Sequence, residues 1–249
     1  ERSRVVPEAS FEHPLVAAVG TSAFDNDWGA ADLVEFVNPE IHPVHTAAFH
    51  HYIRPPRLTR RIHELAEHLK QQLYAFARDF EIEALVVQNA LAIPMNIPLG
   101  VALTEFIAET GFPTIAHHHD FYWERQRFLV NCVPDYLSMA FPPNLPSIHH
   151  VVINSLAGHQ LSLRTGLSAM LIPNVMDFDH PPAPPDDYAR DVRAALDIAP
   201  DEFFFLQPTR VVQRKGIEHA VELVRQLGAK ARLVISHASG DEGSAYEQR

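Results

Sequence analysis

The 249-residue chain is poor in cysteine, in positive charge and in long apolar runs. Its single cysteine, Cys132, permits no disulfide within the chain, which favours a reducing compartment. The formal net charge is -11, whereas nucleic-acid binding depends on basic surface that displaces counterions from phosphates. No apolar run is long enough to span a bilayer, and no signal-peptide pattern opens the chain. We therefore expect a cytoplasmic protein with no nucleic-acid partner and no transmembrane segment.

Glycine is also sparse, and three familiar motifs are missing. The ten glycines form neither the G-x-G-x-x-G fingerprint nor a Walker loop, and no G-x-S-x-G nucleophile elbow occurs. These absences weigh against a dinucleotide oxidoreductase, a P-loop kinase and a hydrolase. Hydrophobic residues make up 47% of the chain, which is the content of a globular protein.

Strand and helix patterns alternate through the middle of the chain. Apolar residues recur every three or four positions over residues 58–76, which predicts a long amphipathic helix. Helices are also predicted from near Pro98 to Gly111 and from a cap at Ser155 to Gly166. Strands are predicted at residues 84–88, 113–116, 150–154 and 169–172, and the runs 15–19 and 33–37 fit either strand or loop. This rhythm predicts an α/β fold with a parallel sheet.

A strand, a basic turn and a helix follow one another over residues 203–227. Residues 203–206 predict a buried parallel strand, and residues 217–227 predict an amphipathic helix whose apolar stripe packs back on the sheet. The turn between them carries Arg210, Arg214 and Lys215. Such a turn, at the N terminus of a helix, is where α/β sheets bind anions. The alternative is a solvated basic turn.

This stretch resembles the start of the second domain of the family 4 glycosyltransferases, which are retaining enzymes of the GT-B type. In that family an Arg and a Lys-Gly hold the diphosphate of a nucleotide-sugar donor, and the resemblance gives this role to Arg210, Lys215 and Gly216. Thr209 stands where the family usually has glycine. The run 173–177 resembles the Pro-Asn-Gly-Val-Asp segment that leads from the family's first domain to its second.

The resemblance implies an α/β protein of GT-B type with two Rossmann-like domains that face a cleft. An acceptor-side domain is expected over residues 1–173, and the start of a nucleotide-sugar-binding domain over residues 174–249, with a proline-rich linker at 180–185 and a helix at 187–196. The second domain is expected to be incomplete, because only strands 203–206 and 233–236 are predicted in it. The family's glycine-rich first turn and its acidic motif with two glutamates also lack counterparts, so we expect segments to be missing at both ends.

Three histidines and an aspartate follow the strand predicted at 113–116. His117 and His119 would project the same way from an extended strand, and with Asp120 they are ligand types for zinc. No second metal motif of recognised spacing occurs, so no metal is expected. Ordinary polar residues at a strand end are another interpretation. The resemblance matches His119 and Asp120 to the His that lies beside the donor sugar, which makes them catalytic candidates together with Arg210 and Lys215.

Four more residues are candidates for the acceptor side. Asn89 and Asn96 follow the strand at 84–88 and would lie at the same edge of a parallel sheet as His119, although asparagines also form turns. Trp123 and Arg125 follow Asp120 closely. An aromatic ring can stack on a sugar face, but packing in a core is as common.

The resemblance thus implies a retaining glycosyltransferase that moves a hexose from a nucleotide diphosphate sugar to the hydroxyl of a small polar acceptor or a glycan. The cations of the basic turn would stabilise the leaving diphosphate, so no cofactor is obligatory. Arg214 is expected to matter little if its side chain points outward. Two alternatives stay open: another GT-B enzyme, such as a nucleotide-sugar epimerase, and a non-catalytic module that binds a nucleotide sugar or a protein.

Overall fold

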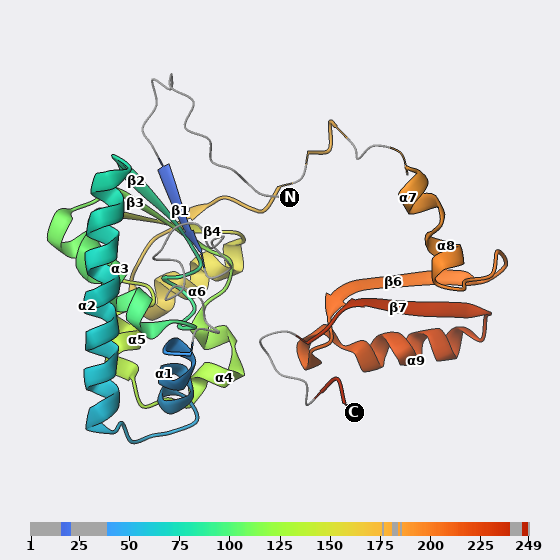
Figure 1. Ribbon diagram of the computed structural model, residues 1–249, viewed down its shortest axis with the longest axis horizontal. Helices are drawn as coiled ribbons and strands as arrows, with labels where there is room; N and C mark the ends of the chain where they lie inside the picture. The colour runs from blue at the N-terminus through green and yellow to red at the C-terminus, as the bar shows by residue number, and fades with distance from the viewer. Residues whose placement is uncertain are drawn as a thin grey trace. The chain divides into compact units, whose positions relative to one another are not determined.

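The computed structural model describes residues 16–20, 39–175, 177–180, 184, 186–239 and 246–248, and for 16–20 only the backbone. The chain divides into two compact units, Glu1–Val175 and Met176–Arg249. Each unit has its own parallel sheet, so the α/β class predicted from the alternating patterns is confirmed (Figure 1). The run 33–37 and most of the linker at 180–185 lie outside the described residues.

Among its described residues, the first unit has five parallel strands in the order β1-β2-β3-β4-β5. Because this is also the order along the chain, every crossover steps to the adjacent position in the sheet. The strands are β1 (Val16–Gly20), β2 (Ala84–Gln88), β3 (Thr114–His118), β4 (Ile148–Val152) and β5 (Met170–Leu171). Within the run 15–19, residues 16–19 therefore belong to a strand, and β4 begins two residues earlier than predicted.

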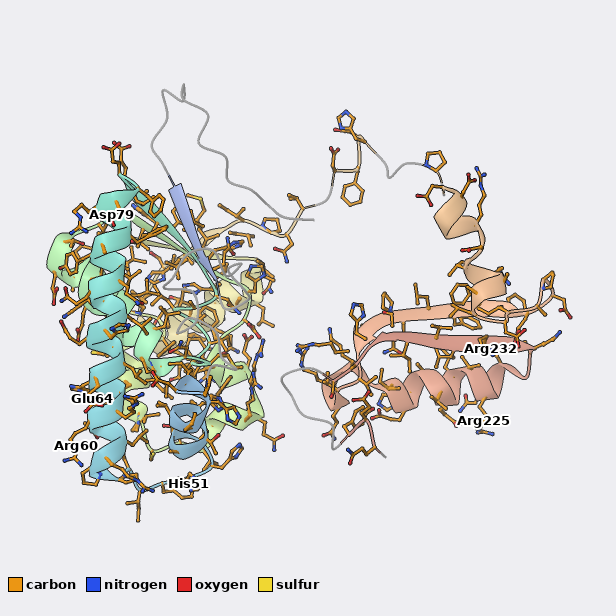
Figure 2. All side chains as sticks on the ribbon, viewed as in Figure 1. His51, Arg60, Glu64, Asp79, Arg225 and Arg232 are labelled. Carbon is orange, nitrogen blue, oxygen red and sulfur yellow. The ribbon has the colours of Figure 1, made fainter. Side chains whose placement is uncertain are left out.

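Helices α1, α2, α3 and α5 of the first unit pack against one another (Figure 1). The helices are α1 (Ile41–Ala48), α2 (Pro56–Asp79), α3 (Ile97–Thr110), the 3-10 helix η2 (Tyr122–Glu124), α4 (Gln126–Leu129), α5 (Pro134–Ala140) and α6 (Ser155–Thr165). The apolar stripe of α2 is buried from Leu58 to Leu69 and half-buried at Leu73 and Phe76. Figure 2 shows Arg60 on the side of α2 away from the rest of the unit. Among the described residues, no helix has the length and apolar character needed to cross a membrane.

Two helices of the first unit show how side chains fix their ends. The Asn96 side chain caps α3 by accepting a hydrogen bond from the Leu99 N–H at 3.0 Å. The predicted cap of α6 at Ser155 is wrong, because Asn154 precedes the first turn and its side chain accepts from the Ala157 N–H at 2.8 Å. Gly111 and Gly166 follow the two helices with φ of 65° and 74°, the left-handed conformation that ends a helix.

One glycine inside α3 permits a close aromatic contact. The Phe141 ring is buried against Gly100, and a Cβ atom added to Gly100 would stand 2.1 Å from Phe141 Cζ. No side chain other than hydrogen fits there.

The second unit contains β6 (Phe203–Arg210), the 3-10 helix η3 (Gln213–Lys215), α9 (Ile217–Leu227) and β7 (Ala231–His237). The predicted strand ended before Pro208, but β6 continues through it to Arg210. Pro208 lacks an N–H, and it falls where the β6–β7 register shifts between Gln207 and Arg210, so it interrupts no regular ladder. The helix predicted at 187–196 is two short helices, α7 (Asp187–Arg190) and α8 (Val192–Ala195).

The burial predicted for the second unit is only partly right. β6 is half-buried rather than buried among the described residues, and on α9 only Ile217 of the apolar stripe is buried, since Val221 and Leu227 are exposed. The polar side of the helix agrees with the prediction: Figure 2 shows Arg225 projecting from α9 away from the strands, and it pairs with Glu222.

Candidate functional site

The polar residues after β3 are hydrogen-bonded to the end of β2. Because the two strands are parallel neighbours, both end at the same edge of the sheet. Asn89 Oδ1 accepts a hydrogen bond from the His119 N–H at 3.0 Å, and Asn89 Nδ2 donates to Asp120 Oδ1 at 2.8 Å. Gln88 Oε1 lies 3.2 Å from His119 Nε2. The structure therefore brings together three of the predicted site residues, Asn89, His119 and Asp120, and adds Gln88, which sequence reasoning missed.

Asp120 also forms an ion pair with Arg125. Arg125 Nε donates to Asp120 Oδ2 at 2.5 Å, and both side chains are partly buried. One carboxylate oxygen of Asp120 thus faces the amide of Asn89 while the other faces a guanidinium. These two contacts hold the Asp120 side chain in place, which suits a group that fixes its neighbours.

The three consecutive histidines point to two different faces. The rings of His117 and His119 lie on one side with centroids 4.7 Å apart, as expected of alternate residues on a strand. His118 points to the other side and shares a hydrogen bond of 2.9 Å with His150 of β4. Within the part of the chain that the structure describes, no group of three or more His, Cys, Asp or Glu side chains is arranged to hold a metal.

Burial keeps the inward histidines neutral. Desolvation, and then the neighbouring His150, lowers the pKa of His118 to about 3, and desolvation lowers the pKa of His150 to about 4. The pKa of His117 is lowered by its partial burial and by His119 beside it. His119 itself is exposed at the edge of the sheet.

Asn96 and Trp123 are held within the fold. Asn96 is only 4% exposed and caps α3, which is the turn-forming alternative that its sequence context left open. The Trp123 ring stacks on the buried Phe121 with centroids 4.5 Å apart, and the Arg164 guanidinium lies 5.4 Å from the Trp123 centroid. Packing therefore accounts for both residues, and their acceptor-side role stays a prediction.

A basic hollow lies where the strands of the second unit end. It has a volume of about 250 Å³ and is lined by Pro208, Thr209, Arg210, Arg214, Lys215 and His237. Arg210 and His237 are paired in register at the ends of β6 and β7, so the hollow occupies the carboxyl edge of this parallel sheet. The structure therefore brings the predicted residues Arg210 and Lys215 to one site.

The turn that carries these cations is tied to the strand. Gln207 Nε2 donates to the Lys215 carbonyl at 2.9 Å. Gly216 follows with φ of 61°, a left-handed conformation that favours glycine, and α9 starts directly after it. The backbone N–H groups of the first turn of α9 therefore begin beside the hollow.

Sequence reasoning missed His237 and treated Arg214 as a residue that matters little if it points outward. Arg214 lines the hollow with the other two cations. His237 could have been nominated, because it directly follows the strand predicted at 233–236 and parallel strands end at a common edge.

No protein-family model matches the chain. It is 37% identical over 172 residues to the mannosylglucosylglycerate synthase of Petrotoga mobilis, a match that covers 68% of this chain and 39% of that protein. It is 37% identical over 166 residues to the protein of the same name from Thermotoga maritima, covering 66% of this chain and 37% of that protein. The mannosylglucosyl-3-phosphoglycerate synthase of Petrotoga mobilis is 26% identical over 198 residues, which are 74% of this chain and 38% of that protein. The chain thus spans about two fifths of the length of the curated relatives that it matches, and its similarity is to synthases of sugar-glycerate conjugates.

Proposed function

We propose that the protein is a nucleotide-sugar-dependent glycosyltransferase. The observation that carries this proposal is the basic hollow, which is lined by Arg210 at the end of β6 and by Arg214 and Lys215 of η3, just before α9. A diphosphate suits such a site, because cations and a helix N terminus both favour negative charge. The names of the three relatives, each a synthase of a mannosylglucosyl compound, support the same activity.

The hollow would act on the leaving group. When the bond between the anomeric carbon and oxygen of the donor breaks, negative charge develops on the nucleoside diphosphate. Arg210, Lys215 and the N–H groups that follow Gly216 would stabilise that charge as it forms. Because these groups supply positive charge, we propose that no metal is obligatory, and turnover in the presence of a chelator tests this point.

In finer detail, we propose a retaining enzyme of the GT-B type in family 4. The support is the resemblance of residues 210–216 and 173–177, the presence of one parallel sheet in each unit, and the position of His119 and Asp120 at a strand end. In this proposal the first unit supplies His119 to the reacting sugar and the second unit binds the donor diphosphate. NMR analysis of the product tests the stereochemistry, because in a retaining reaction the new glycoside has the same anomeric configuration as the donor.

The names of the relatives narrow the substrates. We propose that the protein transfers a mannosyl group to a glucosylglycerate, as the names of the two relatives at 37% identity suggest. A glucosyl-3-phosphoglycerate acceptor is the second candidate, because the relative at 26% identity carries that product in its name. A cytoplasmic location is consistent with the single cysteine.

A donor and acceptor panel tests the function. The full chain would be incubated with mannose and glucose donors that carry different nucleoside diphosphates, each with glucosylglycerate, glucosyl-3-phosphoglycerate or glycerate. Acceptor-dependent release of nucleoside diphosphate, with a new glycoside in the product, is the expected result. Conversion of the donor without any acceptor would favour an epimerase, and binding without turnover would favour a non-catalytic module.

A further inference from the structure

We propose that Gln88 and Asn89, consecutive residues at the end of β2, are positioning residues for His119. Asn89 fixes the backbone on which His119 stands, and Gln88 orients its imidazole ring. The inference rests on the proposed function, in which His119 acts at the reacting sugar. It replaces the acceptor-side role predicted for Asn89 with a role that acts through another residue.

The contacts of Asn89 determine which way its amide faces. Its Oδ1 meets the backbone N–H of His119 at 3.0 Å and that of Asp120 at 3.5 Å, and its Nδ2 meets the Asp120 carboxylate at 2.8 Å. The reversed amide would set an NH₂ group against two N–H donors and an oxygen against a carboxylate, so only one orientation is satisfied. Both the oxygen and the nitrogen of the Asn89 side chain are therefore hydrogen-bonded to the turn after β3.

The backbone of Asn89 is equally engaged. Its N–H donates to the His117 carbonyl at 2.9 Å, and its own carbonyl accepts from Ala92 and Ile93 at 3.0 and 3.1 Å. Its φ of 61° is left-handed, a conformation that asparagine tolerates better than most residues other than glycine. The Asn89 side chain therefore cannot rotate to bind a ligand without breaking its hydrogen bonds to His119 and Asp120.

Gln88 selects the proton position on His119. Gln88 Oε1 lies 3.2 Å from His119 Nε2, and because an amide oxygen only accepts, this pairing requires that the ring nitrogen donate. In the neutral ring the proton is then on Nε2, and Nδ1 presents a lone pair. Nδ1 can accept a hydrogen bond from a sugar or acceptor hydroxyl, which is the task assigned to His119.

The tautomer of His119 tests the proposal without any substrate. Long-range ¹H–¹⁵N NMR of the full chain at mildly alkaline pH should show the Nε2–H form of His119. Gln88→Leu should reduce the share of that form, and Gln88→Glu, which keeps an acceptor, should retain it. A parent protein with the proton on Nδ1, or a Gln88→Leu protein with unchanged His119 signals, overturns the role of Gln88.

Asn89→Gly tests the other half, because glycine keeps the left-handed backbone and removes only the side chain. The His119 backbone amide signal should move, and kcat should fall roughly tenfold or more with little change in KM, as expected when a reacting group is misplaced. The control is Asn131→Ala, which also removes an amide that donates to one backbone group and accepts from another, but these groups belong to Phe128 and Val133 and not to the His119 turn. It should leave the His119 signals and kcat unchanged.

The outcomes separate the two proposals. If Asn89→Gly leaves both the His119 amide and kcat unaltered, the positioning role is wrong whether or not the parent transfers sugar. If the parent transfers no sugar from any donor while the His119 signals respond as described, the positioning holds and the proposed function fails.

Discussion

His118 of β3 and His150 of β4 share a hydrogen bond of 2.9 Å between Nε2 and Nδ1 inside the first unit. Both residues are buried, with 1% and 6% of their surface exposed. The pair sits on the opposite face of β3 from His119, so it belongs to the core rather than to the candidate site. The hydrogen bond needs one ring nitrogen that donates and one that accepts, so both rings cannot be charged at once, and burial disfavours charge on either ring. Protonation of this pair therefore makes the first unit sensitive to acid.

The stability of the first unit should fall between pH 6.5 and about 3, less steeply below about 4, where His150 is protonated in the folded state too. The folded pKa values of His118 and His150 are lowered from 6.5 to about 3 and about 4, so the unfolded chain takes up protons first as the pH drops. The stabilisation is complete above pH 6.5 and is lost below it, with a slope of up to about 1.4 kcal/mol per pH unit for each proton bound only by the unfolded chain. Urea unfolding as a function of pH measures this slope.

The double variant His118→Gln/His150→Gln should flatten that slope relative to the parent, even if its stability at neutral pH is lower. His159→Gln, a change on the exposed side of α6, should leave the slope as it is. An equal slope in the parent and the double variant would assign the acid sensitivity to other groups.

Lys215→Ala should lower kcat strongly and affect donor binding less. The reason is that charge on the leaving diphosphate grows toward the transition state, so a cation in the basic hollow is worth most there. By analogy with the removal of one oxyanion donor, the loss should be roughly a hundredfold to a thousandfold. Steady-state kinetics with nucleoside diphosphate release as the signal provides the measurement.

Arg214→Ala is the comparison for Lys215→Ala. From the sequence alone we expected this change to matter little, provided that the Arg214 side chain points outward. Since Arg214 lines the hollow, we expect a moderate loss in donor affinity rather than no effect. A dispensable Lys215 beside an essential Arg214 would mean that the motif has been assigned in the wrong register.

His119→Ala should reduce turnover by roughly a hundredfold, the scale of a positioned proton-transfer or hydrogen-bonding group. The variant should fold normally, because the side chain is exposed and His119's backbone N–H still meets Asn89. Unfolding curves check the fold and single-turnover rates check the chemistry. Undiminished turnover would refute the role, and activity that zinc restores would instead favour the metal-ligand interpretation of residues 117–120.

Gly100→Ala should destabilise the first unit by about 1 to 3 kcal/mol, because the new methyl group overlaps the Phe141 ring. Phe141→Leu should relieve part of this cost, so the double variant should be less destabilised than the sum of the single variants. Gly158→Ala is the matched control within α6. Its Cβ would meet Val152 at an ordinary 3.4 Å, and the change should be neutral or stabilising.

The sequence predicted those elements whose pattern is local. The stripe of α2 and the apolar run of β2 follow directly from periodicity, and the glycines after α3 and α6 mark their ends. Helix α1 was not foreseen, because its eight residues IHPVHTAA show no repeated stripe and contain a proline. The end of β6 was misplaced because Pro208 normally stops a ladder, whereas here the register shift accommodates it.

Most candidate residues that directly follow a predicted strand were foreseen, and one whose role depends on contacts with a neighbouring strand was missed. His119, Arg210 and Lys215 follow predicted strands, so the rule that ligands bind at carboxyl ends of parallel strands was enough to nominate them. The same rule would have nominated His237, which follows the strand predicted at 233–236 and pairs with Arg210. Gln88 becomes visible only when the neighbouring strand is known, since it contacts His119 from β2. The Asn89 side chain makes hydrogen bonds through both its oxygen and its nitrogen, and it does so from a left-handed backbone conformation that cannot be predicted from composition.

The hydrogen bond from Gln207 to the Lys215 carbonyl has a consequence for the entropy of binding. A flexible basic loop must give up conformational freedom whenever it closes on an anion, and that loss weakens affinity. Here the Gln207 side chain of β6 already holds the turn that carries Arg214 and Lys215. The backbone of these cations would therefore be ordered before a nucleoside diphosphate binds. We therefore expect Gln207→Ala to leave the charge of the hollow unchanged and still weaken the binding of a nucleoside diphosphate. Calorimetry should show the loss of affinity as a less favourable binding entropy.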